Sequence, residues 1–223
     1  MIVGIDTATA ATAAAVWAPG GLAIERRDDP PPGERPGHSA RLLVLVEEVL
    51  AAAGAGWDAV ERIAVGVGPG GFTGLRLGIA TARALAQARD LPLAGVSSLE
   101  ALAAAAGEDA AAATVLAVID ARRGEVFAAA WRGGEQVLEA VAIAPAELAA
   151  IVDPGTLAVG DGAVRFREEL ERAGAVVPPD GSPAHRVSAL AICRLGAGGE
   201  PTERDALLPD YRREPDAKPP RPS

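Results

Sequence analysis

The stretch Gly66-Val-Gly-Pro-Gly-Gly-Phe-Thr-Gly-Leu-Arg-Leu-Gly78 places six glycines within thirteen residues. An apolar run at residues 62–67 precedes it, and an alanine-rich run with helical spacing at 73–89 follows it. Glycine lets another part of the chain approach the backbone closely, and the free amides of a helix start attract negative charge. We therefore expect a strand, a tight glycine loop and a helix, with structural positions at Gly68, Gly70, Gly71, Thr73, Gly74 and Gly78.

The pattern around this loop predicts two copies of one arrangement. In the first copy, strands are expected at 2–6, 12–18, 22–27, 62–67 and 93–96, and helices at 39–53, 73–89 and 98–106. In the second copy, strands are expected at 114–121, 125–132, 137–143 and 157–159, a short apolar segment at 175–177, and helices from 145, at 163–173 and at 188–195. The order βββαβαβα, repeated, predicts an α/β fold of the duplicated ribonuclease-H-like type found in actin, Hsp70 and sugar kinases.

This order also predicts how the chain is divided. Residues 1–107 would form an N-terminal actin-like lobe carrying the partner-binding helices, and 108–223 a C-terminal lobe. The proline-rich end of the second lobe, from Pro209 onward, predicts an irregular tail.

Composition excludes several functional classes. A net charge of −9 disfavours a nonspecific surface for nucleic acid, which needs basic side chains to displace counterions from phosphates. Cys193 is the only cysteine, so an internal disulfide and a cysteine-built metal cluster are excluded. Apolar runs are too short for a membrane span, and the first residues lack the features of a signal peptide. We expect a cytoplasmic protein with no membrane contact.

A nucleotide site between the lobes is one open interpretation. Asp6 ends the first expected strand and could hold magnesium through water, while Thr7 could donate to a phosphate. Asp161, in the second lobe, lies at an expected helix start. The alternative interpretation is that Asp6 and Thr7 complete a turn and that Asp161 caps its helix. The glycine loop lacks the lysine of a Walker A motif and has no acidic residue closing the next strand, as a dinucleotide site would.

Five blocks along the chain resemble the TsaB family of bacterial threonylcarbamoyladenosine biosynthesis subunits, in the order of that family. They are Gly4-Ile-Asp-Thr7, His38-Ser39, Gly68-Pro-Gly-Gly-Phe-Thr-Gly-Leu-Arg-Leu-Gly78, Ile119-Asp-Ala-Arg-Arg-Gly-Glu-Val-Phe127 and Leu208-Pro-Asp-Tyr-Arg212. The resemblance implies an actin-like two-lobed fold and a role in modifying the adenosine beside the anticodon of tRNAs. It also implies the catalytic paralogue TsaD and the ATPase TsaE as partners, with tRNA contacted only through the complex.

The resemblance also separates this chain from TsaD itself. TsaD-like sequences carry two metal-binding histidines after the glycine helix, and here Ser98 and Leu102 stand at those positions. A hydroxyl and an isobutyl group do not replace imidazole ligands, so we expect no metal site. His38 and His185 are isolated in sequence, and no catalytic motif of a hydrolase is present. The charged cluster from Asp120 to Glu125 is compatible with either an anion contact or a solvated hairpin turn.

A protein interface is the remaining interpretation of the two helices of the first lobe. Leu43 and Val44 lie off the main apolar stripe of the first helix, and the second helix is rich in small residues. In the TsaB family, as the resemblance implies, these helices form a bundle with TsaD, or with a second TsaB copy when TsaD is absent. The expected interface residues are His38, Leu42, Leu43, Leu45, Val46, Phe72, Leu75 and Arg76.

Two functional hypotheses follow. The first is a noncatalytic scaffold that dimerises with TsaD and activates it for threonylcarbamoyl transfer, with no cofactor on the isolated chain and ATP with magnesium possible in the complex. The second is an ATP-binding or ATP-hydrolysing enzyme of the actin-like kinase type, working in its own interlobe cleft.

Overall fold

The computed structural model describes residues 1–31, 33–106 and 114–213. The expected boundary between lobes at 107/108 and the tail beyond residue 213 lie outside this part. Strands are β1 Ile2–Asp6, β2 Thr12–Ala18, β3 Leu22–Asp28, β4 Arg62–Gly68, β5 Leu93–Ser97, β6 Thr114–Arg122, β7 Glu125–Arg132, β8 Glu135–Ile143 and β9 Leu157–Val159. Helices are α1 His38–Ala52, α2 Phe72–Arg89, α3 Ser98–Ala105, α4 Pro145–Ala149, α5 Asp161–Arg165, α6 Arg167–Arg172 and α7 Ala189–Gly198.

The strands form two mixed sheets, as the duplicated pattern predicts. The first has the order β3-β2-β1-β4-β5, and the second has the order β8-β7-β6-β9. In each sheet the first strand of the copy pairs antiparallel with the next strand and parallel with a later one. The two sheets therefore repeat one topology.

The second copy departs from the prediction in two places. The helix expected at 163–173 is two helices, α5 and α6, because the backbone leaves helical geometry at Phe166, whose ring packs against the core of the second sheet. The apolar segment expected at 175–177 forms only an isolated bridge between Val176 and Leu157. Among the residues that the structure describes, the second sheet consequently has no counterpart of β5.

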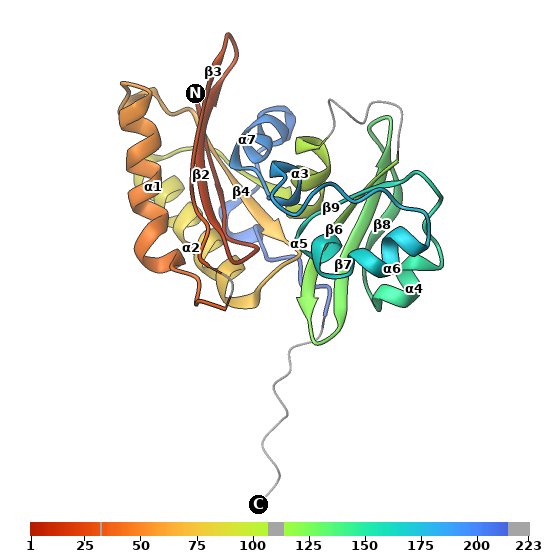
Figure 1. Cartoon of the computed structure of the whole chain (residues 1–223). Helices are drawn as coiled ribbons and strands as arrows, with labels where there is room; N and C mark the ends of the chain where they lie inside the picture. Colours follow the sequence, from red (N-terminus) through yellow and green to blue (C-terminus); the bar gives the residue numbers. More distant parts are fainter. Residues whose placement is uncertain (32, 107–113, 214–223) are drawn as a thin grey trace, which may run out of the picture.

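The elements stack in five layers (Figure 1). Helices α1 and α2 cover one face of the first sheet, where Leu42, Leu45 and Val46 are buried against strand residues such as Val3 and Ile5. Helices α3 and α7 lie between the two sheets. Helices α4, α5 and α6 cover the outer face of the second sheet. The core between the sheets thus belongs to both copies.

The middle layer exchanges helices between the copies. Helix α7 comes late in the chain, yet it packs on β1, β2 and β4 of the first sheet. Helix α3 ends the first copy and packs on β6 and β7 of the second sheet. A Cβ on Gly4 of β1 would lie 2.5 Å from the Ala189 carbonyl oxygen and the Cys193 Sγ, so α7 sits directly on that strand.

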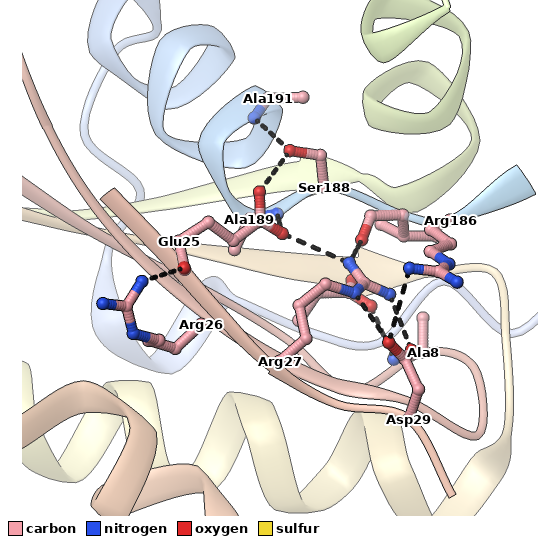
Figure 2. A network of polar contacts seen from close by, with 11 residues as sticks. Ala8, Glu25, Arg26, Arg27, Asp29, Arg186, Ser188, Ala189 and Ala191 are labelled. Atoms are coloured by element: carbon pink, nitrogen blue, oxygen red, sulfur yellow. Dashed lines mark hydrogen bonds and ion pairs between the residues drawn. The ribbon is translucent and has the colours of Figure 1, made fainter. Parts of the chain in front are cut away.

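A polar network fastens α7 to strand β3 (Figure 2). The Glu25 carboxylate accepts from the Ser188 hydroxyl at 2.8 Å and from the Ala189 amide at 3.0 Å, and Ser188 is the N-cap of α7. Arg27 donates to the Val187 carbonyl at 2.7 Å and pairs with Glu25. Glu25 thus satisfies the Ala189 amide at the start of α7, and the Ser188 hydroxyl accepts from the Ala191 amide at 3.3 Å.

Candidate functional site

The glycine loop between β4 and α2 packs against the turn between β1 and β2. The Gly71 amide donates to the Ala8 carbonyl at 2.7 Å, and the Thr7 hydroxyl donates to the Gly74 carbonyl at 2.8 Å. A Cβ on Gly70 would overlap the Ala8 carbonyl, and one on Gly74 would overlap the Thr7 carbonyl. The glycines therefore allow two backbones to touch, which is a structural role.

Two further positions, Gly68 and Gly78, also have no room for a side chain. Gly68 has φ +106°, and a Cβ there would lie 2.9 Å from Leu75 Cδ1. A Cβ on Gly78 would overlap the Thr7 hydroxyl. Thr73 lies exposed in the first turn of α2.

Asp6 and Thr7, expected to meet a phosphate or magnesium, are enclosed by protein instead. Asp6 is 2% exposed and Thr7 is 1% exposed. The Asp6 carboxylate accepts from the Ser98 hydroxyl and the Ala8 amide, both at 3.0 Å. Burial raises the pKa of Asp6 to about 6. Protein groups therefore occupy the polar atoms of both side chains: Ser98 and the Ala8 amide bond to Asp6, and the Gly74 carbonyl accepts from Thr7.

A cavity of about 830 Å³ lies beside this joint. Its walls come from the turn after β1, the glycine loop, the end of β6, the start of α5 and residues 210–213 of the C-terminal segment. Asp161, the third expected nucleotide residue, lines the cavity, whereas Asp6 and Thr7 do not. The structure therefore separates the three residues that the nucleotide interpretation groups together.

The acidic residues of this cavity are engaged with protein partners. Asp161 accepts from the Asp120 amide at 3.0 Å, and burial raises the pKa of Asp161. The Asp120 carboxylate pairs with Arg165 at 2.7 Å and with Arg122 at 3.2 Å. Arg122 and Arg123 have positive φ, as a tight hairpin turn requires. Asp120 thus faces the cavity while the residues after it form the turn.

Ser98 and Leu102, which stand where the resemblance implies histidine ligands in TsaD, are both buried in the core. Ser98 holds Asp6, and Leu102 is fully buried between the sheets. His38 contacts the Thr12 hydroxyl through Nδ1 at 2.9 Å, and burial lowers the pKa of His38. His185 accepts from the Gly160 amide at 3.1 Å. Across the described residues, no group of three or more His, Cys, Asp or Glu side chains is arranged to hold a metal ion.

The outer surface of α1 and α2 divides the expected interface residues into two sets. Leu42, Leu45, Val46, Leu75 and His38 are between 0% and 7% exposed, so their side chains are part of the core and cannot reach a partner. Leu43 at 52%, Val44 at 43% and Phe72 at 45% face solvent. The correction follows the helical period: the main stripe of α1 is used by its own sheet, and the off-stripe residues are left outside.

Helix α2 continues this exposed surface. Arg76, Ala80 and Ala84 are exposed at spacings of four residues, which places them on one face of the helix. We define the outer helical face as the exposed side chains of α1 and α2, namely Leu43, Val44, Phe72, Arg76, Ala80 and Ala84.

Residues of the C-terminal segment also reach this face, and they were missed as functional residues. Tyr211 stacks on Phe72 with ring centroids 5.3 Å apart, and its hydroxyl accepts from Arg76 Nε at 2.8 Å. The signal in the sequence is the block Leu208-Pro-Asp-Tyr-Arg212, one of the five blocks that carry the family resemblance.

None of the helices in the described part of the chain combines the length and apolar character of a membrane span.

Comparison with sequence families points to tRNA modification proteins. A family model described as TsaD, tRNA N6-adenosine threonylcarbamoyltransferase, matches residues 31–168. The tRNA threonylcarbamoyladenosine biosynthesis protein TsaB of Escherichia coli K12 is 40% identical over 134 residues, 60% of this chain and 56% of that protein. The matched stretch thus spans about half the length of that relative. An uncharacterised protein of Mycobacterium bovis is 35% identical over 224 residues, covering 98% of this chain and 94% of that protein.

Solved structures agree on the architecture. YeaZ from Pseudomonas aeruginosa is 30% identical with a TM-score of 0.77, covering 94% of this chain and 98% of that one. A ROK hexokinase from Thermus thermophilus is 14% identical with a TM-score of 0.54, covering 88% of this chain and 98% of that one, and shares the fold alone. The predicted duplicated α/β fold of the actin and sugar-kinase type is confirmed.

Proposed function

We propose, on the premise that the chain belongs to the TsaB/YeaZ family and carries a TsaD-like domain, that it is a noncatalytic subunit of the machinery that makes tRNA threonylcarbamoyladenosine. In this proposal the chain binds a catalytic paralogue of the TsaD family through the outer helical face. The paralogue then transfers the threonylcarbamoyl group to the adenosine beside the anticodon.

The exposed apolar strip of α1 is the observation that carries the proposal. Leu43 and Val44 form the apolar part of a shallow surface depression that also includes Glu47, Glu48 and Ala51. Two adjacent large aliphatic side chains at about half exposure are costly to leave in water on a helix whose core stripe is already satisfied. A partner helix covering this strip would remove that apolar surface from water.

Helix α2 supplies the second feature that supports a helical partner. Ala80 and Ala84 expose only methyl groups, so a partner backbone could come close to α2 there. Small residues beside larger apolar ones give the ridges and grooves through which helices pack.

Activation would follow from differential binding. A subunit changes its partner's activity only if it stabilises the competent conformation more than the idle one. Asp6 and Thr7 are satisfied inside the protein, which supports a noncatalytic role for this chain. In this proposal the paralogue carries out the chemistry. TsaE would join as the ATPase, tRNA would be contacted through the complex, and the complex would work in the cytoplasm.

The test is copurification of this chain with the TsaD paralogue of the same genome, with Leu43→Glu as the variant. The matched control is Val137→Glu, because Val137 on β8 is also 52% exposed but lies in the second lobe. We expect Leu43→Glu to abolish the complex on size-exclusion chromatography while Val137→Glu leaves it intact. An intact complex with Leu43→Glu, or equal loss with both, would contradict the proposal. A homodimer of the isolated chain should be lost with the same variant.

A second candidate function rests on the cavity beside the glycine joint. The cavity has a volume of about 830 Å³, which is the size of a small-molecule site, and the carboxylates of Asp120 and Asp161 line it. These features support an ATP-binding enzyme as the alternative function. Calorimetric titration of the isolated chain with ATP and magnesium decides between the two. Tight binding with turnover favours the enzyme, and its absence favours the subunit.

A further inference from the structure

The C-terminal segment 207–213, which we call the strap, returns to the start of α2 after the chain has passed through both lobes. Leu207 is 4% exposed and packs on the core under α1 and α2. The Asp210 amide donates to the Val67 carbonyl at the end of β4 at 2.8 Å. Arg212 donates to the Ala140 carbonyl of the second sheet at 3.0 Å. The strap is therefore anchored on both sheets, with Tyr211 between the anchors.

Tyr211 holds Arg76 in one orientation. The Arg76 guanidinium carbon lies 3.8 Å from the ring centroid of Phe72 and 5.9 Å from that of Tyr211. The Nε atom donates to the Tyr211 hydroxyl at 2.8 Å. A guanidinium stacked on a ring and bonded through Nε has lost most of its rotational freedom. Its two Nη groups then form a planar fork of fixed direction.

The Nη edge of this fork has no protein partner among residues 1–31, 33–106 and 114–213. Arg76 forms no ion pair there, although the chain carries 30 acidic residues against 21 basic ones. The nearest carboxylate along the strap, that of Asp210, is engaged by Arg212 Nε at 2.7 Å and 2.9 Å. By contrast, Arg83, two turns further along α2, is paired with Asp205. Arg76 is thus an oriented cation without an anion.

We propose that Arg76, positioned by Tyr211 of the strap, binds a carboxylate side chain of the partner protein at the rim of the outer helical face. This inference rests on the proposed function and adds the strap to the interface. A planar fork with two parallel donors matches a carboxylate bidentately. The surroundings are exposed apolar side chains of the outer helical face, which suit a protein surface. The net charge of −9 opposes an RNA backbone as the occupant.

The proposal gives different roles to three substitutions. Arg76→Ala removes the cation, Arg76→Lys keeps the charge but loses the planar fork, and Tyr211→Phe keeps the ring but loses the acceptor of Nε. We expect the dissociation constant for the TsaD paralogue, measured by calorimetry, to rise at least about tenfold with Arg76→Ala and nearly as much with Arg76→Lys. Tyr211→Phe should raise it about threefold to fivefold through the lost orientation. Arg83→Ala is the control and should change it less than about twofold.

A charge exchange identifies the carboxylate directly. Arg76→Glu should abolish binding, and an acid-to-arginine substitution at one position of the paralogue should restore it. Thermal unfolding of the free variants checks that the loss is not a folding defect.

Each outcome decides the proposal. If Leu43→Glu abolishes the complex while Arg76→Ala, Arg76→Lys and Tyr211→Phe bind like the wild type, the inference fails and the proposed function survives. If Arg76→Ala leaves subunit binding unchanged but weakens tRNA binding by the assembled complex, the ligand is an RNA phosphate and the inference also fails. If the wild-type chain does not bind the paralogue, both proposals fall.

Discussion

Asp6 and Asp120 lie near the carboxyl end of the first strand in their respective sheets, yet their surroundings differ. Asp6 is buried, bonded only to neutral donors, and has a raised pKa. The Asp120 side chain is 6% exposed, lines the cavity and pairs with Arg122 and Arg165, both of which reach solvent. At the first position the glycine loop packs on the turn after β1 through the Gly71–Ala8 bond, whereas at the second position Asp161 at the start of α5 accepts from the Asp120 amide. The equivalent carboxylates of the two sheets thus differ in their partners: Asp6 is bonded to neutral groups away from the cavity, and Asp120 is paired with arginines at its wall.

The largest effect is expected from breaking the joint with Gly74→Ala. Alanine is the better helix former by about 1 kcal/mol, but its Cβ would overlap the Thr7 carbonyl, which is backbone and cannot swing aside. We expect the free energy of unfolding to fall by about 3 kcal/mol or more, measured by urea denaturation.

The control for this substitution is Gly56→Ala, since a Cβ there meets nothing within 4 Å. Its free energy of unfolding should change by less than about 0.5 kcal/mol. Equal stability of the Gly74→Ala variant and the wild type would show that the two backbones are not in contact.

An intermediate effect is expected from Asp6→Asn, and it should depend on pH. The folded pKa of about 6 lies above the unfolded value of 3.8, so the folded state binds the proton more tightly. The resulting stabilisation is complete below the unfolded pKa and is lost as pH rises through the folded pKa. An amide in place of the carboxyl has no such dependence.

The difference in free energy of unfolding, Asp6→Asn minus wild type, should therefore rise by on the order of 2–3 kcal/mol from pH 4 to pH 7.5. Urea denaturation at a series of pH values measures this difference. Asp58→Asn, at an exposed carboxylate, is the control and should follow the wild-type profile. Parallel profiles for Asp6→Asn and wild type would mean that Asp6 is not enclosed as described.

The smallest effect is expected from Asp120→Asn. The Asp120 side chain is 6% exposed, but its partners Arg122 and Arg165 have 69% and 48% of their side chains exposed, and ion pairs to solvated arginines contribute little in water. We expect the free energy of unfolding, measured by urea denaturation, to fall by no more than about 1 kcal/mol, and this difference should shrink with added salt. A fall in stability as large as that of Gly74→Ala would show that the Asp120 ion pairs are as important to the fold as the packing of the glycine loop, and would contradict the difference between Asp6 and Asp120.

The local order of the chain could be read from the sequence because it depends on short-range patterns. The spacing of Leu42, Leu45 and Val46 predicts a buried stripe, and Leu43 and Val44 fall outside it, as the structure confirms. The break between α5 and α6 at Phe166 could not be predicted from the sequence, because it depends on how the Phe166 ring packs against the core of the second sheet. Periodicity alone does not tell whether a buried stripe packs on the chain's own sheet or on a partner protein. In the structure Leu42, Leu45 and Val46 of α1 pack with residues of the first sheet, and Leu75 of α2 is buried.

By itself the sequence determined the order of strands and helices as far as β9, the tight glycine joint, and that Ser98 and Leu102 stand where histidines could have bound a metal. Only the tertiary structure decided that Thr7 and Ala8 touch the glycine loop and that α3 and α7 exchange places between the copies. It also brought Tyr211 to Arg76 across 135 residues of chain. Local patterns report which face of an element is apolar, whereas contacts between distant segments depend on how whole layers pack.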